Sequence, residues 1–480
     1  MTNFILTYLP FFISFLIGYF FILTFSDSKK AVSFSEIIFM AGGLGLGISA
    51  QITFFSFAIF EHLNRPFVVG INLTVLITLI VISLWRRQWS IFSLTPGINF
   101  KFKNIWPYLI LIVFAYPLWN HGQFYAFGGW DAWATWNLKS KMLFMSESGW
   151  NVIFDPLLWR SSPHYPLLLP MMNNWGWVFL NNPDYHVPVM TAFIFGFSTV
   201  GLLLSSLLRI TKTYYSILCV TLLLTSPMFV KLSLSQYADI IVAYYLLLGL
   251  ICLLQAKVDN SRIYALIGGV SLGLLSFTKG EGLIASVIIL SLAVFYLFWK
   301  NKPDWKIIFN LYGAALAASV VTIIFTLFFA PKNQTFINGL FSKTDPITFF
   351  RIKAIFIFYC AEMVSSTWNG IWIVLIVGLI FSLGRCFNKN AIIFPAFLLG
   401  YIGIITAFFI VNTYFESSRI LWWLQVTVHR LMYATLPAVV FWTFYSLWES
   451  PIQVNHPPEP PQKIKPSGGK PPKGKSKKSK

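Results

Sequence analysis

Apolar residues fill most of the chain in continuous stretches of about 20, separated by short polar or charged segments. A helix of about 20 apolar residues spans a bilayer core of ~30 Å. The stretches lack the period-two alternation of a membrane β-barrel, and a chain in hydrocarbon must satisfy its own backbone hydrogen bonds. The pattern therefore predicts an all-α polytopic membrane protein of about thirteen spans, near residues 4–25, 35–60, 67–85, 105–120, 186–208, 214–230, 236–256, 262–278, 282–299, 307–330, 368–384, 391–412 and 431–448.

The basic loops between these stretches indicate how the chain is oriented. With thirteen spans they all fall on one side of the membrane, which the positive-inside rule makes cytoplasmic. The outer face then receives two long segments, residues 121–185 and 331–367. Residues 1–448 form one transmembrane domain in this reading. The basic loops contain Lys29, Lys30, Arg86, Arg87, Lys101, Lys103, Arg209, Lys212, Lys257, Arg262, Lys300, Lys302, Lys306, Arg385 and Lys389.

The composition agrees with a membrane protein, since 57% of the 480 residues are hydrophobic and 11% are charged. A formal charge of +19 would suggest nucleic acid in a soluble protein. Here much of it lies in the loops and in a Pro- and Lys-rich tail, residues 449–480, so we expect no nucleic-acid partner. We expect this tail to be cytoplasmic, disordered and attracted to anionic lipid headgroups. The four cysteines have neither a pairwise nor a metal-ligand spacing, which predicts no disulfide and no zinc site.

One carboxylate stands among tryptophans at the start of the first outer segment, in GGWDAWATWNLKSK (128–141). Two glycines before Asp131 allow a sharp turn as the chain leaves the fourth span. The aromatic and apolar pattern of residues 130–145, with Lys139 and Lys141 spaced through it, predicts a helix lying in the membrane interface. Asp131 either caps this helix or faces a polar cavity, where it would accept a proton.

Other unusual polar residues occur at four further places on the same outer side. Taken singly, each is as readily explained by a cap or a surface ion pair, and Lys279 with Glu281 would make a local pair. They are Arg160, His164 and Tyr165 before a second interfacial helix beginning at Pro166; Asp239 at the outer end of a span; Lys279 and Glu281 in a glycine-flanked turn; and Arg419, His429 and Arg430 near the last span. Their shared side predicts that one cavity is lined by Asp131, Arg160, His164, Asp239, Lys279, Glu281 and Arg430.

Five of these stretches resemble, in order, motifs of the bacterial glycosyltransferase C superfamily, within it the family 39 branch of protein O-mannosyltransferases and lipid A aminoarabinose transferases. They are GGWDAW, HYPLLLP, SQYADIIVAYYLLLG, LLSFTKGEGLIA and HRLMYATLP, spread over about residues 110–440. The resemblance implies a multi-span helical fold with two interfacial helices in the first outer loop. It also implies sugar transfer from a polyprenyl-phosphate carrier to a hydroxyl on the periplasmic or outer face of the plasma (inner) membrane.

The resemblance also implies roles for particular residues. Asp131 matches the catalytic aspartate, although Ala132 stands where the family often has a glutamate. The aminoarabinose branch has a lysine before Pro-Pro where this chain has His164-Tyr165-Pro166, which makes His164 a candidate contact for the donor phosphate. The partners would be a polyprenyl-phosphate sugar, membrane lipids and a lipid, glycan or protein acceptor.

These inferences predict inverting transfer, with Asp131 as the general base. Cations would hold the departing phosphate, with Arg160, Lys279 and Arg430 as candidates beside His164, Tyr165, Asp239 and Glu281 in the substrate site. Trp130 and Trp133 either stack on sugar rings or anchor the helix in the interface. The scheme requires no cofactor, and the acidic residues lack the spacing that would indicate a divalent metal. The alternatives are a transporter or flippase of a lipid-linked sugar or anionic lipid, and a non-catalytic membrane scaffold.

Overall fold

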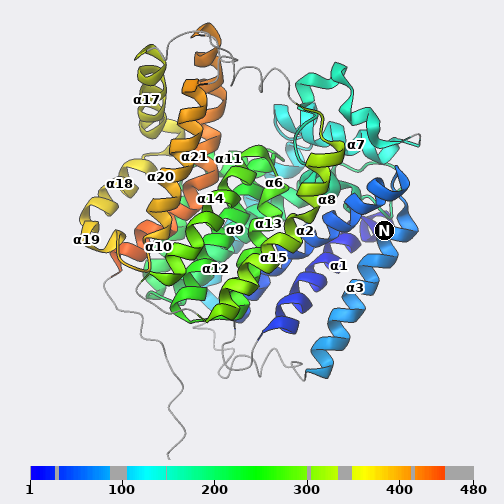
Figure 1. Cartoon of the computed structure of the whole chain (residues 1–480), viewed down its shortest axis with the longest axis horizontal. Helices are drawn as coiled ribbons and strands as arrows, with labels where there is room; N and C mark the ends of the chain where they lie inside the picture. Colours follow the sequence, from blue (N-terminus) through cyan, green and yellow to red (C-terminus); the bar gives the residue numbers. More distant parts are fainter. Residues whose placement is uncertain are drawn as a thin grey trace, which may run out of the picture. The chain divides into compact units, whose positions relative to one another are not determined.

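Helices joined by short loops make up the fold, and no strand occurs among the residues described (Figure 1). The structure is a computed structural model that describes residues 2–26, 32–86, 105–147, 149–299, 304–332, 349–411 and 417–448. The α-helices are α1 (Thr2–Phe25), α2 (Phe34–Phe60), α3 (Arg65–Trp85), α6 (Leu109–Phe124), α7 (Asn137–Met145), α8 (Leu168–Gly176), α9 (His186–Leu208), α10 (Thr213–Leu224), α11 (Pro227–Leu234), α12 (Ala238–Val258), α13 (Arg262–Ser276), α14 (Gly280–Phe298), α15 (Trp305–Ile324), α17 (Phe349–Val364), α18 (Ile371–Phe381), α19 (Leu383–Cys386), α20 (Ile393–Val411) and α21 (Ser417–Leu447). Short 3-10 helices are η1 (Trp106–Tyr108), η3 (Trp150–Phe154), η4 (Pro156–Ser161) and η6 (Ser366–Trp368), and π-helical turns are η2 (Ala132–Trp136) and η5 (Phe325–Phe329).

Within the described residues, eight helices are long and apolar enough to cross a membrane by length and composition. They are α1, α2, α3, α9, α12, α14, α15 and α20, and each lies at a span that the sequence predicts. The prediction of an all-helical, multi-pass membrane protein is confirmed at this level.

The other five predicted spans do not form a single long apolar helix. Residues 214–230 correspond to α10 and α11, which bend by 72° at a break before Pro227. The break has a local cause, because Ser226 caps α11 and a proline in the first turn cannot continue a helix from the preceding segment. Helices α13 and α18 are apolar but short, and α6 and α21 are not among the candidate spans. The count of thirteen stays a prediction.

Helix α12 lies at the centre of the bundle and is buried along its membrane-spanning window, packed against α9, α13 and α21. Small residues allow the closest helix pairs to approach backbone to backbone. A Cβ on Gly45 of α2 would lie 1.7 Å from the carbonyl oxygen of Ser14 in α1, and one on Gly269 of α13 would lie 2.2 Å from that of Leu311 in α15. The pairs α1–α2 and α13–α15 therefore pack with their backbones in close contact.

Two features of the first outer segment bear on the predicted interfacial helices. Residues 130–145 form a helical stretch, η2 followed by α7, in which Lys139 is fully buried. The second helix, α8, begins at Leu168, and all nine of its residues are buried, packed against α1, α2, α7 and α9. The amides of Asn173 and Asn174 bind α7. The position of α8 in the membrane interface stays a prediction.

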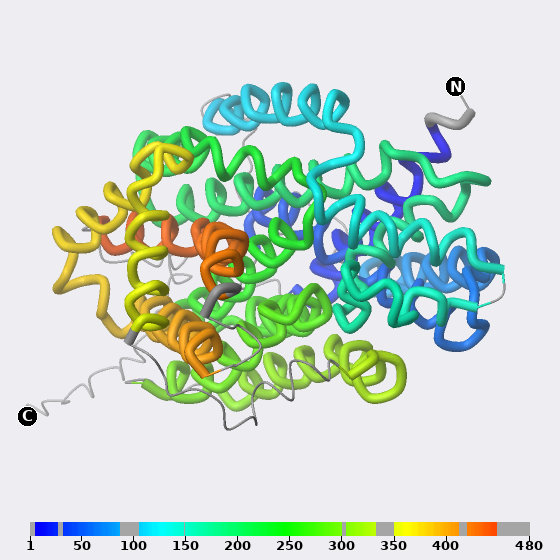
Figure 2. The backbone as a smooth tube through the Cα atoms, turned by 90° about the horizontal axis from the view of Figure 1, so that it is seen from above, coloured from blue at the N-terminus to red at the C-terminus, as the bar shows by residue number. Residues whose placement is uncertain are grey.

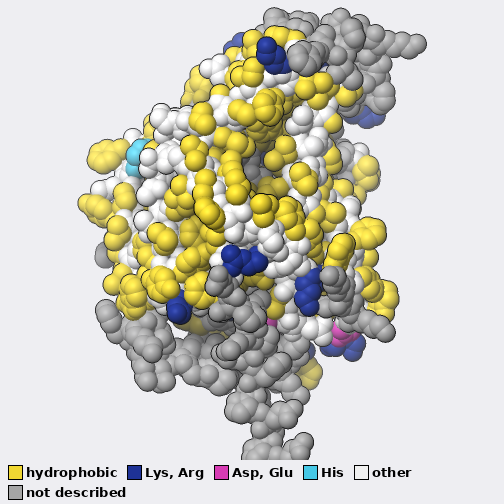
Figure 3. Space-filling model, turned by 90° about the vertical axis from the view of Figure 1, so that its left-hand side faces the viewer, with side chains coloured by type: hydrophobic (Ala, Val, Ile, Leu, Met, Phe, Trp, Pro, Cys, Tyr) yellow, Lys and Arg dark blue, Asp and Glu magenta, His cyan; other side chains and the backbone are white. Residues whose placement is uncertain are grey.

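Viewed from above, α17 to α20 lie on the opposite side of the bundle from the segment of η2 to α8 (Figure 2). On this side, hydrophobic side chains cover a broad band, and Lys and Arg side chains gather toward its upper and lower ends (Figure 3). Such a band is expected of a surface that faces hydrocarbon. Within the predicted outer segment 331–367, the structure describes α17 and η6, whereas residues 333–348 and the predicted tail 449–480 lie outside the described residues.

Candidate functional site

Three carboxylates and two cations from separate parts of the chain meet in one group, which we call the ion cluster. Arg430 of α21 donates from Nη2 to Oδ2 of Asp239 at 2.7 Å and from Nη1 to Oδ2 of Asp131 at 2.5 Å. Lys279, just before α14, lies 3.3 Å from Oδ1 of Asp239 and 3.1 Å from Oε1 of Glu281. The structure thus brings together five residues that the sequence predicts to share one face.

The two aspartates of the ion cluster have different surroundings. The side chain of Asp239 is 4% exposed, and both of its oxygens accept hydrogen bonds from Arg430 or Lys279. The side chain of Asp131 is 31% exposed, and its Oδ1 has no hydrogen-bond partner in the described part of the chain. With three carboxylates and two cations ionised, the cluster carries a net charge of −1. Asp239 holds the cations in place, whereas Asp131 presents an open oxygen.

The chain before Asp131 is fixed by the turn between α11 and α12. The amide of Gly129 donates to the carbonyl of Ser235 at 3.0 Å, and the amide of Asp131 donates to the hydroxyl of Tyr237 at 3.3 Å. A Cβ on Gly129 would lie 2.3 Å from that hydroxyl, and Gly128 has a φ of +67°. Both glycines are therefore needed for the turn. The side chain of Asp131 makes no capping hydrogen bond, so the alternative reading of this residue as a helix cap is wrong.

The same α11–α12 turn reaches the first outer segment through the side chain of Gln236. Its Nε2 donates to the carbonyls of Tyr125 and Ala126, and its Oε1 accepts a hydrogen bond from Asn137 at 2.7 Å. Asn137 in turn accepts from Asn173 of α8 at 3.2 Å. Gln236 is a non-glycine residue with a φ of +58°, a conformation that few residues adopt. This buried network fixes Asp131 relative to Asp239.

Sequence reasoning assigned no role to Gln236 and Tyr237, although both lie in the stretch SQYADIIVAYYLLLG. The pair of adjacent asparagines in the apolar stretch 167–180 is a signal that could have revealed the network, since buried amides need partners.

Tyr165 stands between the ion cluster and a buried lysine. Its ring stacks on Trp136 at 5.7 Å, and the Nζ of Lys139 lies 6.0 Å from its centroid. Burial, and then the charge of Glu281, raises the pKa of Tyr165, so its hydroxyl stays protonated at neutral pH. The Nζ of Lys139 donates to the carbonyl of Ser162 at 2.6 Å, and no carboxylate lies within ion-pair distance of it among the described residues.

The lack of a carboxylate partner affects how Lys139 and its neighbour titrate. Burial lowers the pKa of Lys139 to about 7. Burial and the charge of Lys139 lower the pKa of His164 to about 4, so its imidazole is neutral at pH 7 while no anion is bound.

The side chains of the other predicted residues that the structure describes make no hydrogen bond or ion pair with the ion cluster. Arg160 is exposed, with its guanidinium 5.1 Å from the ring of Trp159. Trp130 and Trp133 are 63% and 49% exposed and pack edge to face at 4.3 Å. They are open either to an interface or to a sugar ring. The Nδ1–H of His429 donates to the carbonyl of Gln425. The side chain of Arg419 lies outside the described residues.

Within the described residues, no three His, Cys, Asp or Glu side chains are grouped as metal ligands would be. Comparisons with protein-family models, with curated proteins and with solved structures found no match for the chain. The function is therefore argued from the geometry of the ion cluster.

Proposed function

We propose that the chain is a membrane glycosyltransferase that moves a sugar from a polyprenyl-phosphate donor to a hydroxyl acceptor, with inversion, at the membrane face where Asp131 opens. The observation that carries the proposal is the contrast between the two aspartates bound by Arg430. Asp239 is buried with both oxygens occupied, while Asp131 is partly exposed with one oxygen open. A general base needs such an open oxygen within reach of the proton that it accepts.

In the proposed reaction, the open Oδ1 of Asp131 takes the proton of the acceptor hydroxyl as that oxygen bonds to the anomeric carbon. The bond from that carbon to the donor phosphate oxygen breaks, and the phosphate leaves with the electron pair. Arg430 holds the other oxygen of Asp131 at 2.5 Å, so the carboxylate has a fixed direction. General base catalysis of this kind contributes about 10²–10⁴ in rate.

The charge of the leaving phosphate needs a cation that is not already paired. Lys279 and Arg430 are matched by the carboxylates of the ion cluster, and Arg160 lies on the exposed surface. Lys139 is a buried amine with no carboxylate partner among the described residues, close to Tyr165. We keep the sequence-based candidates Arg160, Lys279 and Arg430 for the phosphate, and we add Lys139, which a phosphate would reach only if the covering chain moves, because its side chain is fully buried. Binding an anion would favour its protonated form.

The test compares Asp131→Asn with Asp155→Asn. Asp155 is an exposed aspartate of the same segment, whose side chain caps η4, and asparagine caps equally well. Polyprenyl-phosphate sugars and surface glycans are measured by mass spectrometry in cells with the gene, without it, and with each variant. We expect the deletion and Asp131→Asn to accumulate one lipid-linked sugar and to lose one glycan modification. Asp155→Asn should match the wild type.

Purified protein gives the quantitative result once the donor is known. Transfer by Asp131→Asn should fall by two or more orders of magnitude, with the protein folded as in the wild type. Wild-type glycans in the Asp131→Asn strain, combined with altered glycans in the deletion strain, would contradict the role of base. That result would favour the alternative, a transporter or flippase of a lipid-linked sugar or anionic lipid.

A further inference from the structure

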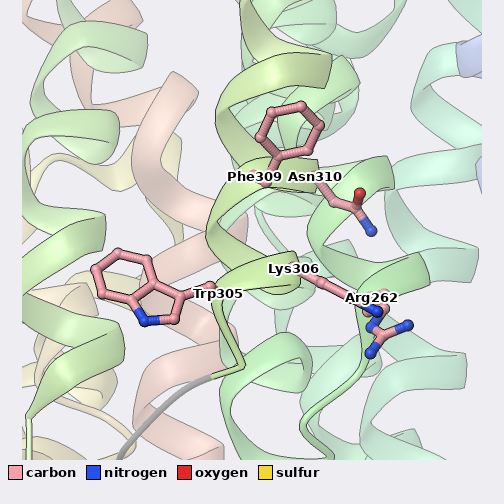
Figure 4. A pocket seen from close by; sticks show the side chains of 5 residues that line it. All are labelled: Arg262, Trp305, Lys306, Phe309 and Asn310. Atoms are coloured by element: carbon pink, nitrogen blue, oxygen red, sulfur yellow. The ribbon is translucent and has the colours of Figure 1, made fainter.

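A second group of cations lies at the far end of α13 from the ion cluster. α13 begins at Arg262 and ends three residues before Lys279, so its two ends are about 22 Å apart at 1.5 Å per residue. A hollow of about 420 Å³ lies there between the first turns of α13 and α15, lined by Arg262, Trp305, Lys306, Phe309 and Asn310 (Figure 4).

Hydrogen-bond donors gather on one side of this hollow. Asp304 caps α15 through Oδ1, and its Oδ2 accepts from Nε of Arg262 at 3.1 Å and from Nη2 at 2.5 Å. The guanidinium is thereby held beside Lys306, with Asn310 one turn further along α15 (Figure 4). Nη1 of Arg262, Nζ of Lys306 and the amide of Asn310 have no hydrogen-bond partner in the part of the chain described. Two cations and one carboxylate leave a net charge of +1.

The other side of the hollow is apolar and continues into the bilayer-facing surface of α15. Trp305 is 70% exposed and Phe309 78% exposed. Exposed apolar side chains continue with Leu316 of α15 and Leu327 of η5. An aromatic pair at the start of a membrane-spanning helix is typical of the headgroup region. A ligand of this hollow would need an anionic head and an apolar body.

We propose that this hollow binds one anionic phospholipid from the leaflet opposite the ion cluster, with Arg262, Lys306 and Asn310 on the headgroup phosphate. Trp305 and Phe309 lie along the glycerol and upper acyl chains. The basic loops predict this end of α13 and α15 to face the cytoplasm, where anionic lipids attract Lys and Arg near the surface. The site is independent of sugar transfer and of the base assigned to Asp131.

The test uses the full chain in detergent, titrated with phosphatidylglycerol or with phosphatidylcholine of the same acyl chains. The first bound lipid is counted by native mass spectrometry. Each cation near an anionic surface contributes about fivefold in affinity, so Arg262→Gln with Lys306→Gln should weaken phosphatidylglycerol binding by about 25-fold. Phosphatidylcholine binding should change by less than about twofold. Arg262→Lys with Lys306→Arg keeps both charges and should stay within about threefold of the wild type.

A matched control removes two exposed lysines elsewhere, Lys212→Gln with Lys231→Gln, which changes the net charge equally. This control should bind phosphatidylglycerol as the wild type does. An equal loss in both double variants would mean that only net charge matters, and it would overturn the site. Displacement of the lipid by millimolar inorganic phosphate would overturn it too, because the apolar body would then add nothing to binding.

Discussion

The ion pair between Arg430 and Asp239 gives the sharpest stability prediction. Arg430→Gln keeps a polar side chain but removes three N–H contacts to Asp239, leaving that carboxylate with Lys279 alone. The charge of the ion cluster then changes from −1 to −2. Asp239 is 4% exposed, so water cannot compensate for the lost partner. Breaking a buried pair by removing one member costs about 3–5 kcal/mol, and we expect this loss for Arg430→Gln.

The second single variant, Asp239→Asn, removes the carboxylate and keeps both cations. Asp131 and Glu281 then balance Arg430 and Lys279, so we expect a smaller loss of about 1–3 kcal/mol from weakened hydrogen bonds. In the double variant the net charge of the ion cluster is again −1. Positions 239 and 430 then both carry neutral side chains, so neither leaves a buried charge without its partner. The double variant should lose no more stability than Arg430→Gln alone. The coupling free energy between the two changes is then about 1–3 kcal/mol.

The assay is a double-mutant cycle on reversible unfolding in mixed detergent micelles, followed by far-UV circular dichroism. The exposed pair of Arg262 and Asp304 serves as the control cycle, with Arg262→Gln and Asp304→Asn. Its coupling should be far smaller, because solvent screens that pair. Additive effects within about 0.5 kcal/mol for Arg430 and Asp239 would refute the reasoning. They would mean that the two side chains do not share a buried contact.

Two further predictions concern the segment around Asp131. Lys139→Met should change the pH dependence of stability. Because burial lowers the pKa of Lys139 to about 7, the unfolded wild-type chain binds more protons than the folded chain above pH 7. Wild-type stability relative to the variant should therefore rise by about 4 kcal/mol from pH 7 to pH 10, and a difference independent of pH in unfolding curves would contradict the burial argument. Gly129→Ala places a Cβ 2.3 Å from the hydroxyl of Tyr237 and should cost about 1–3 kcal/mol, whereas Gly280→Ala meets nothing within 4 Å and should be near neutral. Equal unfolding midpoints for the two alanine variants would exclude the close approach.

The residues of the ion cluster show how far a sequence can locate a site in a membrane protein. Asp239, Lys279 and Glu281 all lie at the ends of apolar stretches. The end of a membrane-spanning helix lies at one of the two faces of the membrane. Once each helix end is assigned to a face, the possible contact partners of a residue there are limited to the polar residues on the same face. Asp131 and Arg430 belong to the same set, although 299 residues separate them.

Lys139 and α8 show where this reasoning stops. Lys139 and Lys141 are two residues apart and so lie on nearly opposite sides of a helix. Only the packing of α7 against α8 buries the first and leaves the second exposed. In the same way, the apolar stretch 214–230 reads as one span, although Pro227 is visible within it. A local hydrophobic pattern shows which residues avoid water. It does not show whether such a residue contacts lipid or the protein core, because both environments exclude water.

The sequence by itself determined that the chain is helical, crosses a membrane several times, and carries a set of ionisable residues at the ends of its helices. These properties follow from hydrophobic length and charge position, which are local. Only the tertiary structure decided that Arg430 joins Asp131 to Asp239, that Tyr237 and Gln236 fix the turn before Asp131, and that Lys139 is buried without a carboxylate partner among the described residues. These contacts join segments about 20 to 300 residues apart, and their geometry depends on how whole helices pack.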